Sequence, residues 1–328
     1  MAEIVFGLAT SHTPMLNAEP ADWLSNFQVL DQKRGHRDKD GNRVTYDELL
    51  AKADTRAAAV LNEAAVAERH ARAQAGLRRV RDELAAAKLD ALIVVGDDQA
   101  EMFGTDNLPA ILIYYGETIL NTPRHLGGPS RLDWNQRAAA AFYNDPAKDY
   151  LVDAPLALHL IGALNEAGFD ISSADKVNGE GEGHAVAFVH NRVMQGEAVP
   201  VVPLFLNTYY PPNQPSPSRC FALGQAIRRA VEAMPGEARV GIAASGGLSH
   251  FTVDEELDRS VLDALQAKDA AVLTGLPLNK LEAGSSEIRN WICAGGALES
   301  LAMDWSDYIP GYRSPAGTGT GIAFAVWS

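Results

Sequence analysis

Residues 91–99 read ALIVVGDDQ, and this stretch decides the fold class of the chain. Its first five residues form a continuous apolar run rich in β-branched side chains, which is typical of a strand buried on both faces of a parallel sheet. The run ends abruptly at Gly96-Asp97-Asp98-Gln99, where polar residues take over. Because such a strand needs helices on both faces, the stretch indicates an α/β fold.

The same alternation of apolar runs and helical patterns continues on both sides of this stretch. Further strands are predicted at 4–8, 109–115, 199–206, 239–244 and 321–327. Helices are predicted at 54–88 (one long or two shorter ones), 154–167, 218–234, 252–267 and 286–301. We therefore expect one α/β domain over residues 1–328, with a mainly parallel central sheet covered by helices on both faces. A helical and polar insertion is expected at about 17–85.

Three local signals refine these boundaries. Gly168 directly follows a predicted helix and is expected to end it in the left-handed conformation. Thr252 and Glu255 have the spacing of a capping box, Thr-x-x-Glu, which would open the helix that runs to about residue 267. The glycine-rich run at 317–321 is followed by a strand and not by a helix, so we interpret it as a turn and not as a phosphate loop.

Composition excludes several classes of protein. The chain has 328 residues, of which 47% are hydrophobic, and its 28 Lys+Arg against 42 Asp+Glu give a net charge of −14. Such a charge argues against nucleic acid, since duplex binding draws on clustered Lys and Arg. No apolar run approaches the roughly 18 residues needed to span a bilayer, and Cys220 and Cys293 cannot build a disulfide framework. We expect a cytoplasmic globular protein that binds neither nucleic acid nor membrane.

Polar residues follow three of the predicted strands. These segments are Ser11-His12, Asp97-Asp98-Gln99 and Ser249-His250. Ligands of open α/β sheets bind outside the carboxyl ends of the strands, so the three segments are expected to converge on one site. Each also has a simpler interpretation, as a loop histidine or as aspartates that cap the following segment.

Two further residues carry chemistry in this pattern. His250 directly precedes a predicted helix, whose dipole would lower its pKa and favour the neutral imidazole that a general base requires. Glu287 lies four residues before Trp291 in the first turn of another predicted helix, where the dipole alone would also favour a glutamate. No His-Glu-x-x-His, Cys-x-x-Cys, Walker or Gly-x-Ser-x-Gly string is present.

Taken in order, these segments resemble a known family. The segments that carry the resemblance are Thr10–Pro14, Gly96–Gln99, Asn207–Pro212, Arg219–Gly224, Ser245–His250, and Glu287 with Trp291. Together they resemble the class III extradiol ring-cleavage dioxygenases, the superfamily of the protocatechuate 4,5-dioxygenase beta subunit. The length and the Gly-Asp-Asp-Gln form look closest to the 3-O-methylgallate dioxygenase group.

The resemblance implies an Fe(II) enzyme in which two histidines and a glutamate hold the metal. His12 matches the first histidine, and Glu287 matches the glutamate. His250 matches the catalytic acid/base histidine of the family, and His184 matches a further active-site histidine near the substrate.

One position departs from the family pattern. Gln99 occupies the place of the second iron histidine, and glutamine is a poor iron ligand beside imidazole. Either Gln99 or Asp98 coordinates the metal, or another histidine moves in, or iron is not bound productively. His184 is the foremost substitute and His36 a lesser one.

The other histidines match no motif. His70 is expected on a helix surface, and the remaining three are expected to be solvated or in the core: His125, His159 and His190. Asn207 and Tyr209 are candidates for lining the substrate pocket, and they are equally reasonable as turn formers.

The implied reaction is Fe(II)-dependent extradiol (meta) ring cleavage by O2, in the catabolism of lignin-derived aromatics. The substrate would be a catechol-type aromatic acid such as 3-O-methylgallate, gallate or protocatechuate. Its carboxylate needs a cationic or amide partner, which the sequence does not identify. Two alternatives are a metal-altered, zinc-dependent hydrolase or lyase relative, and a non-catalytic partner subunit. We expect a homodimer. The protocatechuate enzyme uses a small second subunit to cover its site; here either self-association or residues 17–85 would close the pocket, and a small second subunit is a further alternative.

Overall fold

The computed structural model describes residues 1–104, 106–123, 138, 140–195 and 199–328, so His125 lies outside the described residues. Its main sheet contains β1 (Glu3–Thr10), β4 (Ala91–Asp97), β5 (Ile111–Tyr114), β8 (Ser172–Ala174), β9 (Val201–Leu206), β10 (Arg239–Ser245), β11 (His250–Thr252), β12 (Met303–Tyr312) and β13 (Thr318–Trp327). Two small sheets pair β2 (His36–Arg37) with β3 (Arg43–Val44), and β6 (Thr118–Asn121) with β7 (Lys148–Leu151).

The strand order confirms the predicted α/β fold with a mainly parallel sheet. The order is β11-β13-β1-β10-β4-β9-β5-β8, and β12 pairs with β13 beside this path. The four central strands β1, β10, β4 and β9 are mutually parallel. β13 and β5 run antiparallel to their neighbours β1 and β9, so the sheet is mixed towards its edges.

Helices fill the connections between these strands. The α-helices are α1 (Pro20–Leu24), α2 (Asn26–Lys33), α3 (Tyr46–Lys52), α4 (Thr55–Ala59), α5 (Glu63–Ala87), α7 (Ala154–Glu166), α8 (His184–Phe188), α9 (Pro217–Ala233), α10 (Glu255–Ala267), α11 (Ala270–Thr274) and α12 (Ile288–Ala297). Shorter turns are η1 (Pro14–Leu16), η3 (Leu278–Lys280) and η4 (Ala283–Glu287), and η2 (Val189–Met194) is a π-helix. No helix of the described residues is both long and apolar enough to cross a membrane.

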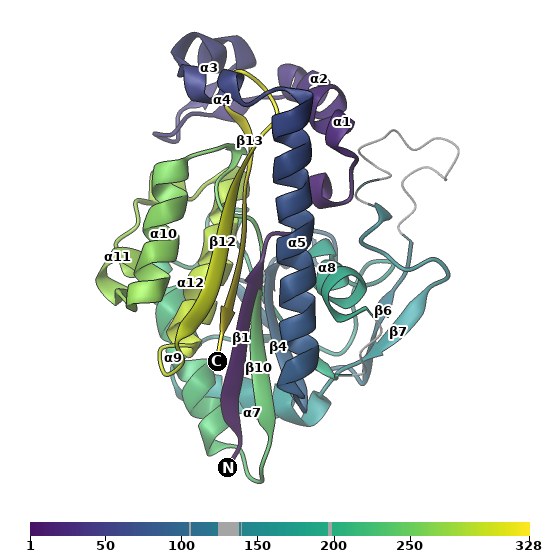
Figure 1. Cartoon of the computed structure of the whole chain (residues 1–328). Coiled ribbons are helices and arrows are strands. Elements are labelled where there is room, and N and C mark those ends of the chain that lie inside the picture. Colours follow the sequence, from purple (N-terminus) through teal and green to yellow (C-terminus); the bar gives the residue numbers. More distant parts are fainter. Residues whose placement is uncertain (105, 124–137, 139, 196–198) are drawn as a thin grey trace.

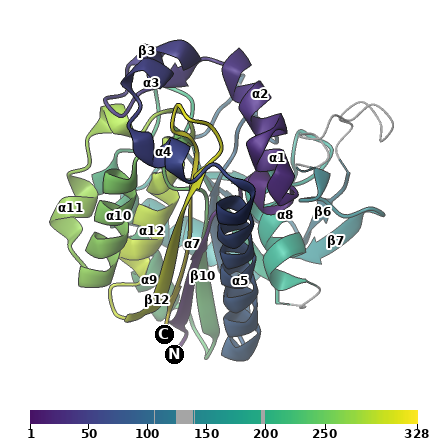
Figure 2. The ribbon, with the colours of Figure 1, turned by 45° about the horizontal axis from the view of Figure 1, so that its top comes forward.

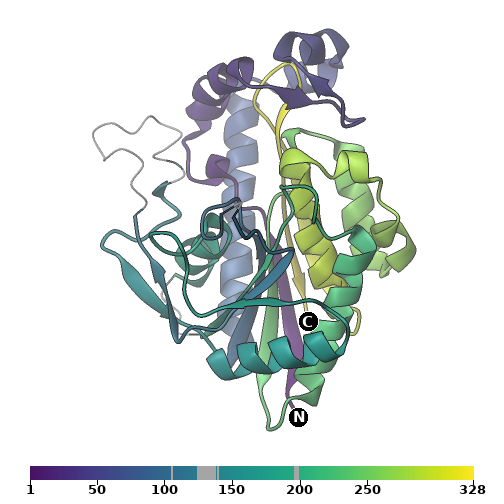
Figure 3. The same ribbon diagram turned by 180° about the vertical axis from the view of Figure 1, so that it is seen from behind.

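Two hydrophobic cores lie on the two faces of the sheet. Figure 1 shows the long helix α5 along one face, and the view from behind in Figure 3 shows α7, α9 and α12 on the other. Side chains of β4 alternate between the cores: Ala91, Ile93 and Val95 join the α9/α12 side, and Leu92 and Val94 join the α5 side. This period of two is the reason why the run in β4 is apolar at every position.

Local sequence accounts for the helix ends. The pattern at 54–88 forms two helices, α4 and α5, and the side chain of Asn62 caps α5 by accepting a hydrogen bond from the Ala65 amide. Gly168 adopts a positive φ of 87° after α7, as predicted. Between α9 and α12 the backbones approach so closely that a Cβ atom on Gly224 would collide with the carbonyl oxygen of Cys293.

The segment before α5 covers the carboxyl edge of the central strands. In Figure 1 the helices α1 to α4 lie at the top, beyond the ends of these strands, and Figure 2 turns this cap towards the viewer. A buried ion pair fixes it to the end of β12: Arg313 donates to both carboxylate oxygens of Asp31, at 2.6 and 2.8 Å. The hydroxyl of Thr318, the first residue of β13, donates to the same carboxylate at 2.6 Å.

Three local predictions were wrong. Thr252 does not open α10: it lies in β11, and the side chain of Asp254 caps the helix by accepting from the Leu257 amide. The glycine-rich run at 317–321 is mostly strand, because β13 already begins at Thr318 and pairs with β11 and β12. The pattern at 286–301 contains η4 and then α12, which ends at Ala297.

Candidate active site

The three polar segments that follow the parallel strands do end at one edge of the sheet. Thr10 of β1 lies beside Ser245 of β10, and Ala244 of β10 lies beside Val95 of β4. The residues just beyond these positions therefore meet above the same edge. Glu287, which precedes α12, and His184, the first residue of α8, reach the same place from the two helical layers.

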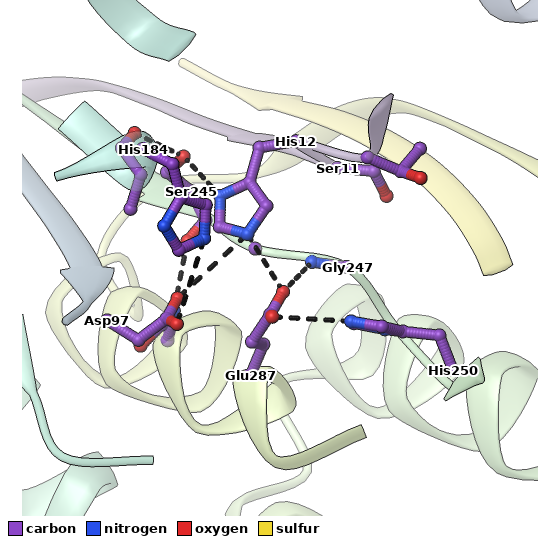
Figure 4. A network of polar contacts seen from close by, with 12 residues as sticks. Ser11, His12, Asp97, His184, Ser245, Gly247, His250 and Glu287 are labelled. Atoms are coloured by element: carbon purple, nitrogen blue, oxygen red, sulfur yellow. Dashed lines mark hydrogen bonds and ion pairs between the residues drawn. The ribbon is translucent and has the colours of Figure 1, made fainter. Parts of the chain in front are cut away.

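Four of these side chains form a compact buried cluster (Figure 4). His12, Asp97, His184 and Glu287 each offer one ligand atom, and these atoms lie within 4.8 Å of one another. Nε2 of His12 lies 3.0 Å from a Glu287 oxygen and 4.0 Å from an Asp97 oxygen. Nε2 of His184 lies 4.0 Å from the other Asp97 oxygen, and the two imidazole rings meet edge to face at 4.5 Å.

The tautomer of His12 follows from its hydrogen bonds. Its Nδ1 lies 3.1 Å from the hydroxyl of Ser245, and that hydroxyl donates its only hydrogen to the carbonyl oxygen of Ala185 at 2.7 Å. Ser245 must therefore accept from His12, so Nδ1 carries the proton. Nε2 is left facing the carboxylates, buried and without a hydrogen-bond partner among the described residues.

His184 is oriented in the same way by a carboxylate. Its Nδ1 lies 2.6 Å from Oε2 of Glu101, which also accepts from the backbone amide of His184 at 2.8 Å. A carboxylate that holds one ring nitrogen while the other faces a metal is the common arrangement around histidine ligands. Burial alone would lower the pKa of His184, but Glu101, with Asp97 and Glu287, raises it to about 10.

His250 stands beside the cluster and shares Glu287 with it. Its Nε2 lies 3.2 Å from Oε1 of Glu287, and its Nδ1 donates to the Leu248 carbonyl at 2.8 Å. The ring fits between Gly247 and Gly284, where a Cβ atom on either glycine would collide with it. The Gly247 amide also donates to the second oxygen of Glu287 at 2.7 Å.

The predicted influence of a helix dipole on His250 was wrong. His250 lies in β11, and the next helix begins only at Glu255. Burial would lower the pKa of His250, but the adjacent Glu287 carboxylate outweighs burial and raises it. Glu287 therefore stabilises the protonated form of the His250 ring, whereas the predicted helix dipole would have destabilised it.

The pKa values of the two carboxylates of the cluster are shifted in opposite directions. Burial, with the neighbouring Glu287 charge, raises the pKa of Asp97 to about 6. Burial would also raise the pKa of Glu287, but His250 and His12 hold it well below its usual range. Glu287 is thus the fixed negative charge of the site, whereas Asp97 can carry a proton near neutral pH.

Gln99 and Asp98 have different tasks from one another. The Gln99 amide nitrogen lies 3.2 Å from Asp97 and 3.4 Å from Glu287, so it donates towards both carboxylates of the cluster. Asp98 turns away and accepts from the backbone amides of residues 101, 102 and 103, which is the capping role that the sequence left open. Asp97 is the aspartate that reaches the cluster.

A pocket of about 310 Å³ opens above the cluster. Its lining includes His12, His184, His250, Glu287, Gln99 and Tyr209. The Tyr209 hydroxyl lies 3.5 Å from Glu287, and burial, with the Glu287 charge, raises its pKa well above 10, so the phenol stays protonated. A larger cavity of about 590 Å³ on the β2–β3 side contains none of the four cluster residues, so we assign the chemistry to the smaller one.

Asn207, the other residue predicted to line the pocket, does not line it. Its side chain donates to the Tyr210 carbonyl and to Asn213, both at 2.6 Å, and accepts from the Tyr210 amide at 2.9 Å. These bonds fold the loop that carries Tyr209, so Asn207 is a turn former.

The remaining described histidines serve the fold. Nε2 of His36 donates to the Asp31 carbonyl at 2.8 Å, and His36 lies outside the cluster. His70 is half-buried, bonds to the Ala18 carbonyl at 3.1 Å and packs on Trp23, so it is more than a surface residue. His159 bonds to the Ala230 carbonyl, and His190 is fully buried against Glu182 and a stacked tyrosine ring.

The donor set fits a divalent metal ion. Two imidazole nitrogens beside carboxylate oxygens are typical ligands of non-haem iron and of zinc, and two histidines with one carboxylate form the triad of Fe(II) oxygenases. The decisive observation is the buried Nε2 of His12, which has no hydrogen-bond partner in the described part of the chain and faces two carboxylates. A cation between these groups would satisfy all of them.

Sequence reasoning missed several of these contributions. Asp97 was passed over in favour of Asp98 and Gln99, although its place as the last residue of a strand aims it at the site. Glu101 matched no motif, and Ser245 entered only as the first residue of a segment that carried the resemblance, so neither was predicted to orient a histidine. Their roles depend on contacts between segments far apart in the chain.

An α/β sheet with a His/Asp/His/Glu cluster in a pocket at its carboxyl edge defines a protein with a candidate metal-dependent active site. Residues 59–323 match the family described as the catalytic LigB subunit of aromatic ring-opening dioxygenase, so the chain belongs to that family. The match confirms the resemblance to the extradiol dioxygenase superfamily that the motifs indicated.

Two curated relatives have similar sequences over part of their length. The gallate dioxygenase of Pseudomonas putida is 34% identical over 113 residues, covering 31% of this chain and 33% of that protein. The 2,3-dihydroxyphenylpropionate/2,3-dihydroxicinnamic acid 1,2-dioxygenase of Comamonas testosteroni is 32% identical over 117 residues, covering 35% of each. The chain thus spans about a third of the length of the curated relatives it matches.

Proposed function

We propose that this protein is an Fe(II)-dependent extradiol dioxygenase that opens the ring of a catechol-type aromatic acid with O2. Membership of the family of catalytic ring-opening subunits supports the reaction class. The observation that carries the proposal is the orientation of His12, whose unpartnered Nε2 faces Asp97 and Glu287 inside a pocket that His250 also lines. Substrates of this class include 3-O-methylgallate, gallate and protocatechuate.

We propose His12, His184 and Glu287 as the metal ligands, with Asp97 beside them. Gln99 then acts as a hydrogen-bond donor that holds the two carboxylates in place and not as a ligand, because its amide nitrogen faces both of them. When bound, Fe(II) supplies a redox centre and a template for the diol and O2.

His250 performs the acid–base work in this proposal. Its Nδ1 is fixed on the Leu248 carbonyl, so Nε2 is the atom that gains or loses a proton, and it faces Glu287 at the pocket wall. We propose that it takes a phenolic proton from the substrate and returns a proton during ring opening. Tyr209 stays protonated and offers a hydrogen-bond donor at the same wall.

We further propose that the chain is one catalytic domain whose N-terminal cap closes the pocket. Phe27 and Leu30 of α2 contribute to the lining, which supports closure by the chain itself over closure by a small second subunit. We expect a homodimer in light scattering of the purified chain. Activity that appears only after a second polypeptide is added would contradict closure within the chain.

The test is metal analysis after anaerobic purification, followed by an oxygen-electrode screen of the Fe(II)-loaded protein. Gallate, 3-O-methylgallate, protocatechuate and catechol serve as substrates, and a Glu287→Gln variant as the control. We expect diol-dependent oxygen uptake that the variant lacks. Stoichiometric zinc without oxygen uptake on any diol would favour a hydrolase or lyase, and no bound metal would favour a non-catalytic subunit.

A further inference from the structure

A cationic side chain lines the pocket from the side of the cap. Arg34 follows the last residue of α2 and is half-buried in the lining that also contains His12, His250 and Glu287. The sequence did not single out Arg34, because it follows none of the predicted parallel strands and matches no motif. It belongs to the segment of the chain that the family match does not cover, because that match begins at residue 59.

Arg34 has no anionic partner among the described residues. The neighbouring Arg313 already occupies both carboxylate oxygens of Asp31, at 2.6 and 2.8 Å. The guanidinium of Arg34 instead lies over the ring of Phe251, with 4.6 Å between its central carbon and the ring centroid. Burial and the nearby Arg313 lower its pKa, but a guanidinium keeps its charge and its five donors near neutral pH. Arg313 thus takes up the Asp31 carboxylate, and among the described residues the positive charge of Arg34 is left without an ion pair at the pocket.

The backbone holds Arg34 firmly in this place. Its amide donates to the Asp31 carbonyl at 3.3 Å, and the same carbonyl is bound by His36 at 2.8 Å. Asp31 itself is fixed by Arg313 and by the Thr318 hydroxyl. The backbone of Arg34 is therefore tied, through Asp31, to the end of the main sheet.

The position of Arg34 is coupled to that of the acid–base histidine. The Phe251 ring on which the guanidinium stacks packs edge to face against the His250 ring, with 5.4 Å between centroids. The lining also contains Glu101, whose carboxylate binds His184. An anion in this pocket is therefore attracted towards the Arg34 guanidinium.

We infer that Arg34 is the residue that binds the carboxylate of the aromatic acid and so selects carboxylated diols over neutral ones. The inference rests on the proposed function and extends it to substrate choice. A guanidinium binds a carboxylate through two parallel hydrogen bonds, which fixes the direction of the ring as well as its charge. This also explains how a chain with a net charge of −14 accepts an anionic substrate.

The experiment compares kcat/KM for protocatechuate with kcat/KM for catechol, which lacks the carboxylate. For Arg34→Gln, we expect the ratio to fall by about 10- to 100-fold, because one charge-assisted pairing is lost, with most of the change in KM for protocatechuate. Arg34→Lys keeps the charge but loses the paired geometry, so its ratio should lie between the two. Arg37→Gln is the matched control: Arg37 lies three residues further on, pairs with Glu282 and is not in this lining. Its ratio should equal that of the wild type.

A second measurement does not need catalysis. Calorimetric titration of the metal-free protein with benzoate and with benzamide, its neutral counterpart, should show a preference for benzoate that Arg34→Gln abolishes and Arg37→Gln retains. If the wild type opens diols and Arg34→Gln leaves the ratio unchanged, the inference fails while the proposed function stands. If no diol supports oxygen uptake by the wild type, the proposed function fails. The benzoate titration then decides alone whether Arg34 forms an anion site.

Discussion

The Ser245→Ala substitution tests whether the orientation of His12 serves metal binding. Ser245 accepts the Nδ1 proton of His12 at 3.1 Å and passes its own hydrogen to the Ala185 carbonyl. Without the hydroxyl, the metal-free protein can move the proton to Nε2, where Glu287 lies 3.0 Å away. The metal-bound protein cannot change tautomer in this way, because Nε2 must then carry the lone pair that binds the ion. The substitution therefore destabilises the metal-bound state more than the metal-free state.

The expected size follows from this asymmetry. A buried donor without a partner costs about 1–3 kcal/mol, and removal of groups that orient metal ligands weakens metal affinity by roughly 10- to 100-fold. We expect the dissociation constant for Fe(II) to rise by that factor, measured anaerobically by competition with a chromogenic chelator. The overall fold should persist, since only one hydroxyl is removed.

Ser11→Ala is the matched control for this measurement. Ser11 is buried beside His12, and its hydroxyl accepts from the Ala323 amide at 2.9 Å and contacts the Gly321 carbonyl at 3.4 Å, but it does not touch the imidazole ring. It should lose about 1 kcal/mol of unfolding free energy and keep the wild-type metal affinity. Equal weakening of metal binding in both variants, or none in Ser245→Ala, would refute the role assigned to the His12 tautomer.

Three further predictions concern proton release, catalysis and packing. Because the pKa of His184 is raised to about 10, the metal-free protein holds a proton on His184 at pH 7, and the metal must displace it. Metal binding should therefore release about one proton, and the metal affinity should increase about tenfold per pH unit up to that pKa. Calorimetry in two buffers of different ionisation enthalpy counts these protons; no release would contradict either the raised pKa of His184 or its role as a ligand. His250→Ala should lower kcat by about 10²- to 10⁴-fold with metal content unchanged, and a normal rate in the steady-state assay would disprove its acid–base role. Gly224→Ala should destabilise the fold despite a gain of about 1 kcal/mol in helix propensity, since overpacking against Cys293 costs about 1–3 kcal/mol. Gly162→Ala, whose Cβ would meet nothing within 4 Å, should instead stabilise it, and urea denaturation that shows the same sign for both variants would contradict the packing argument.

The sequence predicted those parts of the fold whose partners are chosen by hydrophobic pattern. β4 shows this well: its apolar run at 91–95 is found as a strand, although the hydrogen-bonded ladder extends to Asp97. β12 was not predicted, because Asp, Ser, Pro and Gly interrupt it and only its pairing with β13 makes it a strand. The glycines at 317–321 look like a turn for the same reason, since their extended conformation comes from neighbouring strands and not from propensity.

For the site, the same distinction applies. The rule that ligands gather at the carboxyl ends of parallel strands was sufficient to bring His12 and the segments around Asp97 and His250 together. It could not rank Asp97 above Asp98, because that choice depends on which side chain caps the backbone of residues 101–103. The rule also could not find Arg34. This residue matters because it lines the pocket without an ion pair among the described residues, and only three-dimensional contacts reveal that.

The position of β13 has a consequence for the order of folding. β13 follows every other strand in the chain, yet it lies next to β1 in the sheet and pairs with β11, the strand that begins with His250. Contacts between such distant segments form slowly, because a long loop must close before they contribute. Until β13 arrives, β1 keeps an open edge and β11 has no neighbour in the sheet. In an intermediate without β13, β11 would have no strand partner, so we expect the main sheet to be completed and His250 to take its place at the pocket wall in the same late step.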